Sequence, residues 1–194
     1  MRLRAHIGVL VCTFLFASTV AQAAVYFPIE DGELFRRSDA VIVATSLGSR
    51  VVPGPGGLPE THTAFAVADS LRGGLRGEVE VVVPGGALAS GLELAIADVP
   101  RFVPGAKYVL ALKLGRDGAF RPAELGLGAF EVVVDEQGRS FATRALFRGG
   151  AARPALAREA DGTTVARPEP LRDLEGFTAW LREARYADPA ETTE

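Results

Sequence analysis

The sequence is poor in the residue types that most often carry chemistry. Its 194 residues include one cysteine and two histidines. Cys12 lies in an N-terminal stretch that we expect to be removed, so the mature chain would have no disulfide and no thiolate. His62 would then be the one histidine left, too few for an ordinary zinc site. Glu30, Asp31 and Glu33 cluster, but their spacing matches no calcium-binding loop. We therefore predict no catalytic residue, no metal and no cofactor.

The sequence also lacks an excess of positive charge and a second long apolar run. Lys and Arg number 21 against 24 Asp and Glu, which gives a formal net charge of −3. An acidic chain without a basic stripe argues against nucleic acid as a partner. Beyond the N-terminal stretch, no apolar run is long enough to span a membrane. We therefore expect no nucleic acid partner and no membrane span after signal cleavage.

Residues 1–23 have the pattern of a secretory signal peptide. Arg2 and Arg4 precede an uncharged, largely apolar run from Ile7 to Ala21, and Ala21-Gln22-Ala23 offers the small residues that signal peptidase accepts. The apolar run of roughly 15 residues is shorter than the ~20 that a membrane-spanning helix needs. We therefore expect cleavage after this site and export to the periplasm or the extracellular medium.

Changes in apolar periodicity divide the rest of the chain into segments. Residues 39–148 alternate between apolar and polar positions, as half-buried strands do. The remaining predictions are an N-terminal segment with a short helix at 24–38, a linker with a small hairpin at 149–170, an amphipathic helix at 171–186 and a disordered tail at 187–194.

Five stretches of residues 39–148 place large apolar side chains on one face of a strand. Asp117-Gly118 lies between two such stretches, as a hairpin turn does, and Asp135–Gly138 is a longer turn with glycine where a positive φ is favoured. We predict a mainly β fold, a small antiparallel OB-like β-barrel with a C-terminal amphipathic helix, and keep a β-sandwich as the alternative. The apolar faces contain Phe65, Val67 and Leu71; Val79, Val81 and Val83; Leu92, Leu94 and Ile96; Tyr108, Leu110, Leu112 and Leu114; and Phe130, Val132 and Val134.

Several short motifs occur in a familiar order between Leu34 and Phe147. They are Ser38-Asp39-Ala40-Val41-Ile42-Val43, Leu71-Arg72-Gly73, Val83-Pro84-Gly85-Gly86, Pro100-Arg101-Phe102-Val103-Pro104-Gly105 and Gly128-Ala129-Phe130. In this order the chain resembles an uncharacterised family of exported bacterial proteins. That family is in turn similar to the netrin and metalloproteinase-inhibitor (NTR) module, which implies an OB-type five-stranded barrel with added helices.

The resemblance implies a fold more than an activity. The animal inhibitors of this module use disulfides and an N-terminal cysteine that chelates the zinc of the target protease. Here the expected mature chain begins Ala24-Val25-Tyr26-Phe27 and has no cysteine. Inhibition by that mechanism would therefore lack the scaffold that holds the chelating amine.

Three loops of the predicted barrel are the expected contact surfaces, because loops on a rigid scaffold often carry recognition. They are Pro53–Glu60, Pro84–Gly91 and Asp98–Gly105. We predict an exported, non-catalytic binding or accessory module whose partner is another exported protein or a surface ligand. The predicted binding residues are Phe102 as an anchor or a barrel plug, with Arg101, Pro84, Gly85 and Gly86. Alternatives are a protease-associated partner or inhibitor, and a hydrolase that uses Glu78, Glu80 or Asp98.

Overall fold

The computed structural model describes residues 29–144, 155–158, 164–167 and 170–184. The expected signal peptide, much of the expected linker and the expected tail lie outside these residues. No helix within them is long and apolar enough to cross a membrane. The elements are α1 (Asp31–Arg36), β1 (Ala40–Pro53), η1 (Pro55–Gly57), β2 (Pro59–Arg72), β3 (Glu78–Pro84), β4 (Gly86–Ala87), β5 (Glu93–Leu94), β6 (Lys107–Leu114), β7 (Phe120–Pro122), η2 (Leu125–Gly128), β8 (Ala129–Val134), β9 (Ser140–Arg144), β10 (Ala155–Arg158), β11 (Thr164–Arg167), β12 (Arg172–Asp173) and α2 (Leu174–Ala184).

Five strands close into a ring, which confirms the OB-like barrel. The order is β1-β2-β3-β7-β6, and β6 pairs again with β1. All of these pairings are antiparallel except β3 with β7, which meet in parallel at Val81 and Phe120. A closed ring leaves fewer exposed strand edges than an open sheet. β8, β9 and β12 continue the sheet beyond β6, and β10 pairs with β11 where the sequence predicts a small hairpin.

Two apolar cores lie on opposite sides of β1 and β6, because alternate residues of a strand point to opposite faces. Burial of each large apolar side chain in them contributes about 1.5–3 kcal/mol. The barrel core contains Ala40, Ile42, Ala44, Phe65, Val79, Val81, Tyr108, Leu110, Leu112 and Ala129. The helix-side core contains Leu34, Phe35, Val41, Val43, Leu71, Val109, Ala111, Ala123, Leu127, Phe130, Ala142, Phe177 and Leu181.

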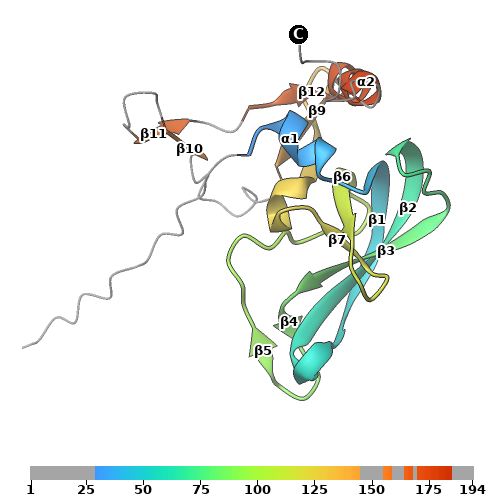
Figure 1. The fold of residues 1–194 in the computed structure, drawn as a ribbon, viewed down its shortest axis with the longest axis vertical. Coiled ribbons are helices and arrows are strands. Elements are labelled where there is room, and N and C mark those ends of the chain that lie inside the picture. The colour runs from blue at the N-terminus through green and yellow to red at the C-terminus, as the bar shows by residue number, and fades with distance from the viewer. Residues whose placement is uncertain (1–28, 145–154, 159–163, 168–169, 185–194) are drawn as a thin grey trace, which may run out of the picture.

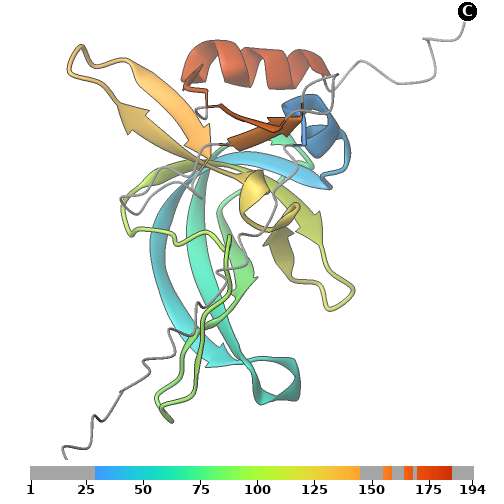
Figure 2. The ribbon, with the colours of Figure 1, turned by 90° about the vertical axis from the view of Figure 1, so that its left-hand side faces the viewer.

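The two described α-helices lie at one end of the molecule, and β4 and β5 lie at the other (Figures 1 and 2). At the helix end, Phe35 of α1 lies 5.8 Å from the ring of Phe130 and 5.7 Å from that of Phe177 in α2. Leu34 and Phe35 are both buried, as the short-helix prediction requires. Aromatic contacts therefore dock α1 and α2 onto β8.

At the same end, an ionic contact connects α1 with β9 and β12. Asp31 of α1 accepts hydrogen bonds from Arg144 of β9 at 2.8 Å and from Arg172 of β12 at 2.5 Å. Arg172 also lies over the rings of Phe130 and Phe177, at 5.0 and 5.6 Å. The side chain of Arg144 is 4% exposed, so the charge of Asp31 offsets the desolvation of a buried guanidinium.

The C-terminal helix begins three residues later than predicted. Leu171 precedes it and is 63% exposed, so it is not part of the apolar face. The carboxylate of Asp173 accepts a hydrogen bond from the backbone N–H of Gly176 at 2.8 Å. A side-chain oxygen that accepts a hydrogen bond from the first turn favours the start of a helix. The predicted start at residue 171 was based on the spacing of apolar residues and did not include this contact. Phe177 and Leu181 are buried in the helix-side core as expected.

Register shifts in β2 separate residues that the sequence places on one face. Phe65 and Val67 face the barrel core, but Leu71 lies in the helix-side core. The pairing of β1 with β2 passes over Ala68 and Leu71, because Ala44 pairs with Val67 and Val43 with Asp69, and Ile42 pairs with Ser70 and Val41 with Arg72. Each extra residue reverses the alternation, so the prediction of a single face for all three was wrong.

Candidate functional site

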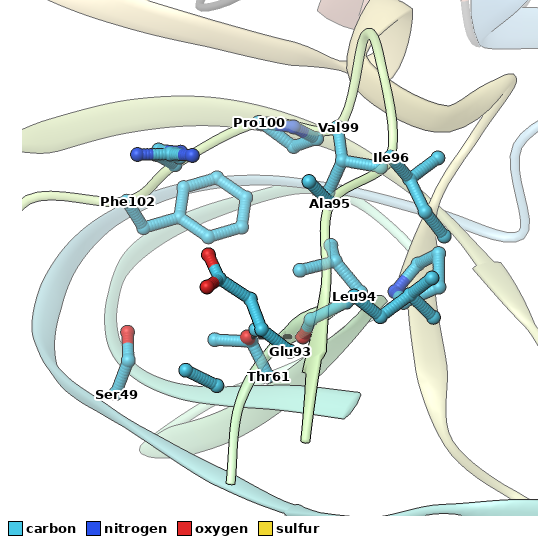
Figure 3. A pocket seen from close by; sticks show the side chains of 15 residues that line it. Ser49, Thr61, Glu93, Leu94, Ala95, Ile96, Val99, Pro100 and Phe102 are labelled. Carbon is cyan, nitrogen blue, oxygen red and sulfur yellow. Dashed lines mark hydrogen bonds between the residues drawn. The ribbon is translucent and has the colours of Figure 1, made fainter. Parts of the chain in front are cut away.

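One pocket of about 330 Å³ lies between the β4–β5 arm and the segment that leads from β5 to β6 (Figure 3). We use "arm" for residues 85–96, which contain β4 and β5. Ser49 of β1 and Thr61 of β2 form part of the pocket wall. The lining includes all five residues predicted to bind: Pro84, Gly85, Gly86, Arg101 and Phe102. Two of the three predicted loops therefore meet at one concave surface.

Gly85 and Gly86 allow the arm to fold closely against the barrel. Their φ angles are +98° and +124°. A Cβ atom on Gly85 would lie 2.8 Å from the carbonyl oxygen of Leu94, and one on Gly86 would lie 2.8 Å from Oγ1 of Thr61. Glycine is needed at both positions, because a side chain would clash and would strain the backbone. The hydroxyl of Thr61 also donates to the carbonyl of Gly85 at 2.7 Å.

Phe102 forms both a wall of the pocket and the edge of the barrel core. Its ring makes edge-to-face contacts with Phe65, at 4.9 Å between centroids, and with Tyr108, at 5.2 Å. The Tyr108 hydroxyl accepts a hydrogen bond from the backbone N–H of Val103 at 2.9 Å. These contacts place the ring of Phe102 against the barrel core, as the plug interpretation predicts, and the same residue lines the pocket, where an anchor would lie.

Two side chains of opposite charge line the pocket. Glu93 extends from β5, and in Figure 3 its carboxylate points into the hollow on the side of Phe102. Arg101 precedes Phe102 in the chain. Among the described residues, neither Glu93 nor Arg101 makes an ion pair or a side-chain hydrogen bond. The pocket thus combines apolar surface with one acceptor group and one donor group that remain available.

Apolar side chains are exposed around this pocket. Leu92 is 47% exposed, Ile96 is 39% exposed and Val103 is 41% exposed. The sequence predicted a half-buried strand with Leu92, Leu94 and Ile96 facing the core, and that prediction was wrong. β5 is only two residues long and pairs with β4, outside the ring. Clustered exposed apolar residues are typical of interaction surfaces.

The first predicted loop, Pro53–Glu60, does not line the pocket. Pro53 pairs with Pro59, and the N–H of Gly54 donates to the carbonyl of Leu58 at 2.7 Å. The loop is therefore a hydrogen-bonded turn that closes the β1–β2 hairpin, although its Gly-Pro composition suggested a loop without regular structure.

His62 belongs to a charged network on the outer surface of the barrel, which sequence reasoning missed. Its Nδ1–H donates to Oε1 of Glu80 at 2.7 Å, and Arg50 also pairs with Glu80. The hydrogen bond from His62, followed by that from Arg50, holds the pKa of Glu80 below its usual range. Cross-strand registry brings them together, since Arg50 pairs with His62 and Ala64 pairs with Glu80. Only the strand register could have revealed this network.

The other candidate carboxylates do not converge on the pocket. Glu78, Glu80 and Asp98 are absent from its lining, and a general acid would need a raised pKa, whereas that of Glu80 is lowered. Hydrogen bonds from Arg36 and Arg37 likewise lower the pKa of Glu33. In the part of the chain that the structure describes, no group of three or more His, Cys, Asp or Glu side chains is placed to hold a metal ion.

Comparisons with known proteins add no relative. No protein-family model matches the chain, and no curated protein matches it. The functional argument therefore depends on the geometry of the pocket.

Proposed function

We propose that the protein is an exported, non-catalytic binding module, and that the arm pocket is its ligand-binding surface. The observation that carries the proposal is the convergence of Pro84–Gly86 with Arg101 and Phe102 on one pocket bordered by exposed apolar side chains. A volume of about 330 Å³ lies at the lower end of the range of ligand pockets, roughly 300–1,000 Å³. The apolar border extends beyond the pocket, which favours another exported protein as the partner.

The proposal depends on rigidity as well as on exposure. Phe102 is held by two aromatic neighbours, and the carbonyl of Asp98 accepts a hydrogen bond from the N–H of Gly126 at 3.1 Å. A preformed wall lowers the entropic cost of binding, since less of the surface must be ordered when the ligand arrives. An OB-type barrel commonly binds its ligands on one strand face and on the adjoining loops.

Photo-crosslinking in an exporting bacterial host tests the binding surface. A photoreactive amino acid placed at Ile96, which lines the pocket, should yield a discrete crosslinked protein. The matched control is Val134, which is 64% exposed in β8, outside the pocket lining. Phe102→Ala should abolish the crosslink from position 96 while the protein remains folded. Equal crosslinking from both positions, or from neither, would contradict the proposal.

Cell fractionation tests export separately. We expect the full chain to leave the cytoplasm and its mature form to begin at Ala24 by mass spectrometry. A variant without residues 1–23 should stay in the cytoplasm. If the full chain also stays there with an intact N-terminus, the export part of the proposal is wrong and the pocket must serve a different compartment.

A further inference from the structure

The charged side chains of the pocket indicate the chemistry of its ligand more specifically than the shape of the pocket does. Within the part of the chain described here, Glu93 and Arg101 line the same hollow and neither is neutralised by another side chain. By contrast, two carboxylates of the barrel surface have cationic partners: Asp117 pairs with Arg121 at 2.7 Å, and Glu80 pairs with His62 at 2.7 Å. Two opposite charges that remain unpaired beside an aromatic wall favour a ligand that brings complementary charges.

The arm also offers main-chain groups to a ligand. β4 and β5 form a two-stranded sheet, so in the described residues each has one strand neighbour and one edge without a strand partner. Exposed strand edges are recognised by extended peptides, in which main-chain hydrogen bonds provide affinity and side-chain pockets provide specificity. Leu92 and Val103, which flank Glu93 and Phe102 in the chain, add exposed apolar area beyond the pocket itself.

From these features we propose that the ligand is an extended segment of a partner protein with an apolar anchor side chain between a basic and an acidic residue. The anchor packs on Phe102, the basic side chain pairs with Glu93, and the acidic side chain pairs with Arg101. This inference rests on the proposed function and narrows it to one ligand chemistry.

Peptide titrations followed by amide chemical shifts of the purified mature chain test the proposal. The probes are four pentapeptides with blocked termini: Gly-Lys-Phe-Asp-Gly, Gly-Gln-Phe-Asp-Gly, Gly-Lys-Phe-Asn-Gly and Gly-Gln-Phe-Asn-Gly, each also in reversed order. In at least one chain direction, replacing Lys or Asp in the probe should weaken binding about threefold to fivefold, as expected for a partly exposed ion pair.

Charge-neutralising variants assign each effect to one side chain. Glu93→Gln should remove the preference for Lys over Gln and keep that for Asp over Asn, and Arg101→Gln should do the reverse. The matched controls are Glu136→Gln and Arg116→Gln, two exposed residues outside the pocket lining, and both preferences should survive in them.

Several results would overturn the inference. They are equal affinity for all of the probes, preferences that survive in the Glu93 and Arg101 variants, shifts confined to amides outside the pocket, or no shifts at millimolar peptide. Binding only by unblocked Gly-Phe-Gly would show that the charges recognise the ends of a small peptide. Crosslinking from position 96 separates the two proposals: if it persists while the peptides fail, only the ligand chemistry is wrong.

Discussion

The helix end and the arm end of this protein use the same residue types in opposite ways. At the helix end, Phe130 is fully buried and Asp31 is held by two arginines. At the arm end, Leu92 and Ile96 are exposed, and Glu93 makes no ion pair with a described residue. Phe130 and Asp31 at the first end are thus buried or paired within the protein, whereas the corresponding groups at the second end face outward. If the arm is the binding surface, as proposed, stability and recognition are separated along the barrel.

The largest expected loss of stability comes from a substitution at the helix end. Phe130→Ala removes the ring that contacts Phe35 and Phe177 and should lower the free energy of unfolding by about 3–5 kcal/mol. Chemical denaturation measures it. Phe102→Ala, at the arm end, is the comparison and should cost clearly less, because Phe102 is only partly buried. Equal losses would remove the distinction between the two ends.

Removing the ionic contact of Asp31 should cause the next largest loss of stability. Asp31→Asn removes the carboxylate that Arg144 and Arg172 both contact and should destabilise the protein by roughly 2–3 kcal/mol. Thermal unfolding measures the change. Glu136→Gln, an exposed carboxamide substitution, controls for the loss of one negative charge. A change of less than ~0.5 kcal/mol for Asp31→Asn would show that the helix end does not depend on this contact.

Replacing a glycine of the arm should destabilise the arm and leave the rest of the barrel intact. Gly86→Ala places a Cβ atom against Thr61 and should cost about 1–2 kcal/mol. Hydrogen exchange should accelerate in β4 and β5 and remain slow in β1 and β6. Gly91→Ala is the control, because Gly91 also has a positive φ but no atom within 4 Å of the added Cβ. If both variants accelerate exchange equally, backbone strain alone explains the effect.

Acid should weaken the charged network on the barrel surface. The pKa of Glu80 in the folded protein lies below its ordinary value of 4.5. Ionised Glu80 therefore favours the folded state above about pH 4.5, and this contribution is lost as the pH falls toward the folded pKa. Glu80→Gln should narrow the difference between melting temperatures at neutral pH and near pH 3.5. Glu78→Gln, on the same strand, controls for the loss of one carboxylate.

The smallest stability effect is expected at the pocket border. Ile96→Ser removes an exposed apolar side chain and should change the free energy of unfolding by no more than about 0.5 kcal/mol. It should nevertheless weaken capture of the partner, measured by a photoreactive group at Leu94, which also lines the pocket. Unchanged capture would mean that the apolar border takes no part in binding.

Much of the architecture was predictable from local pattern. Period-two alternation identified β3, β6 and β8, and Asp117-Gly118 marked the hairpin between β6 and β7, because both signals depend on neighbouring residues. The five residues predicted to bind come from the Gly-Gly and Pro-x-Phe loops, and all of them line the pocket. Alternation failed at Leu92–Ile96 and at Leu71, where apolar spacing alone does not say which surface the residues meet.

The periodicity of apolar residues is sufficient to predict a mainly β chain with a C-terminal helix, because each strand and the helix must bury one face. The contacts of Asp31 with Arg144 and of His62 with Glu80, and the lack of an ion pair at Glu93 among the described residues, follow from the three-dimensional packing alone. These contacts join residues far apart in the chain, and their geometry depends on strand register and on bulges. A shift of one residue would turn each side chain to the opposite face of its sheet.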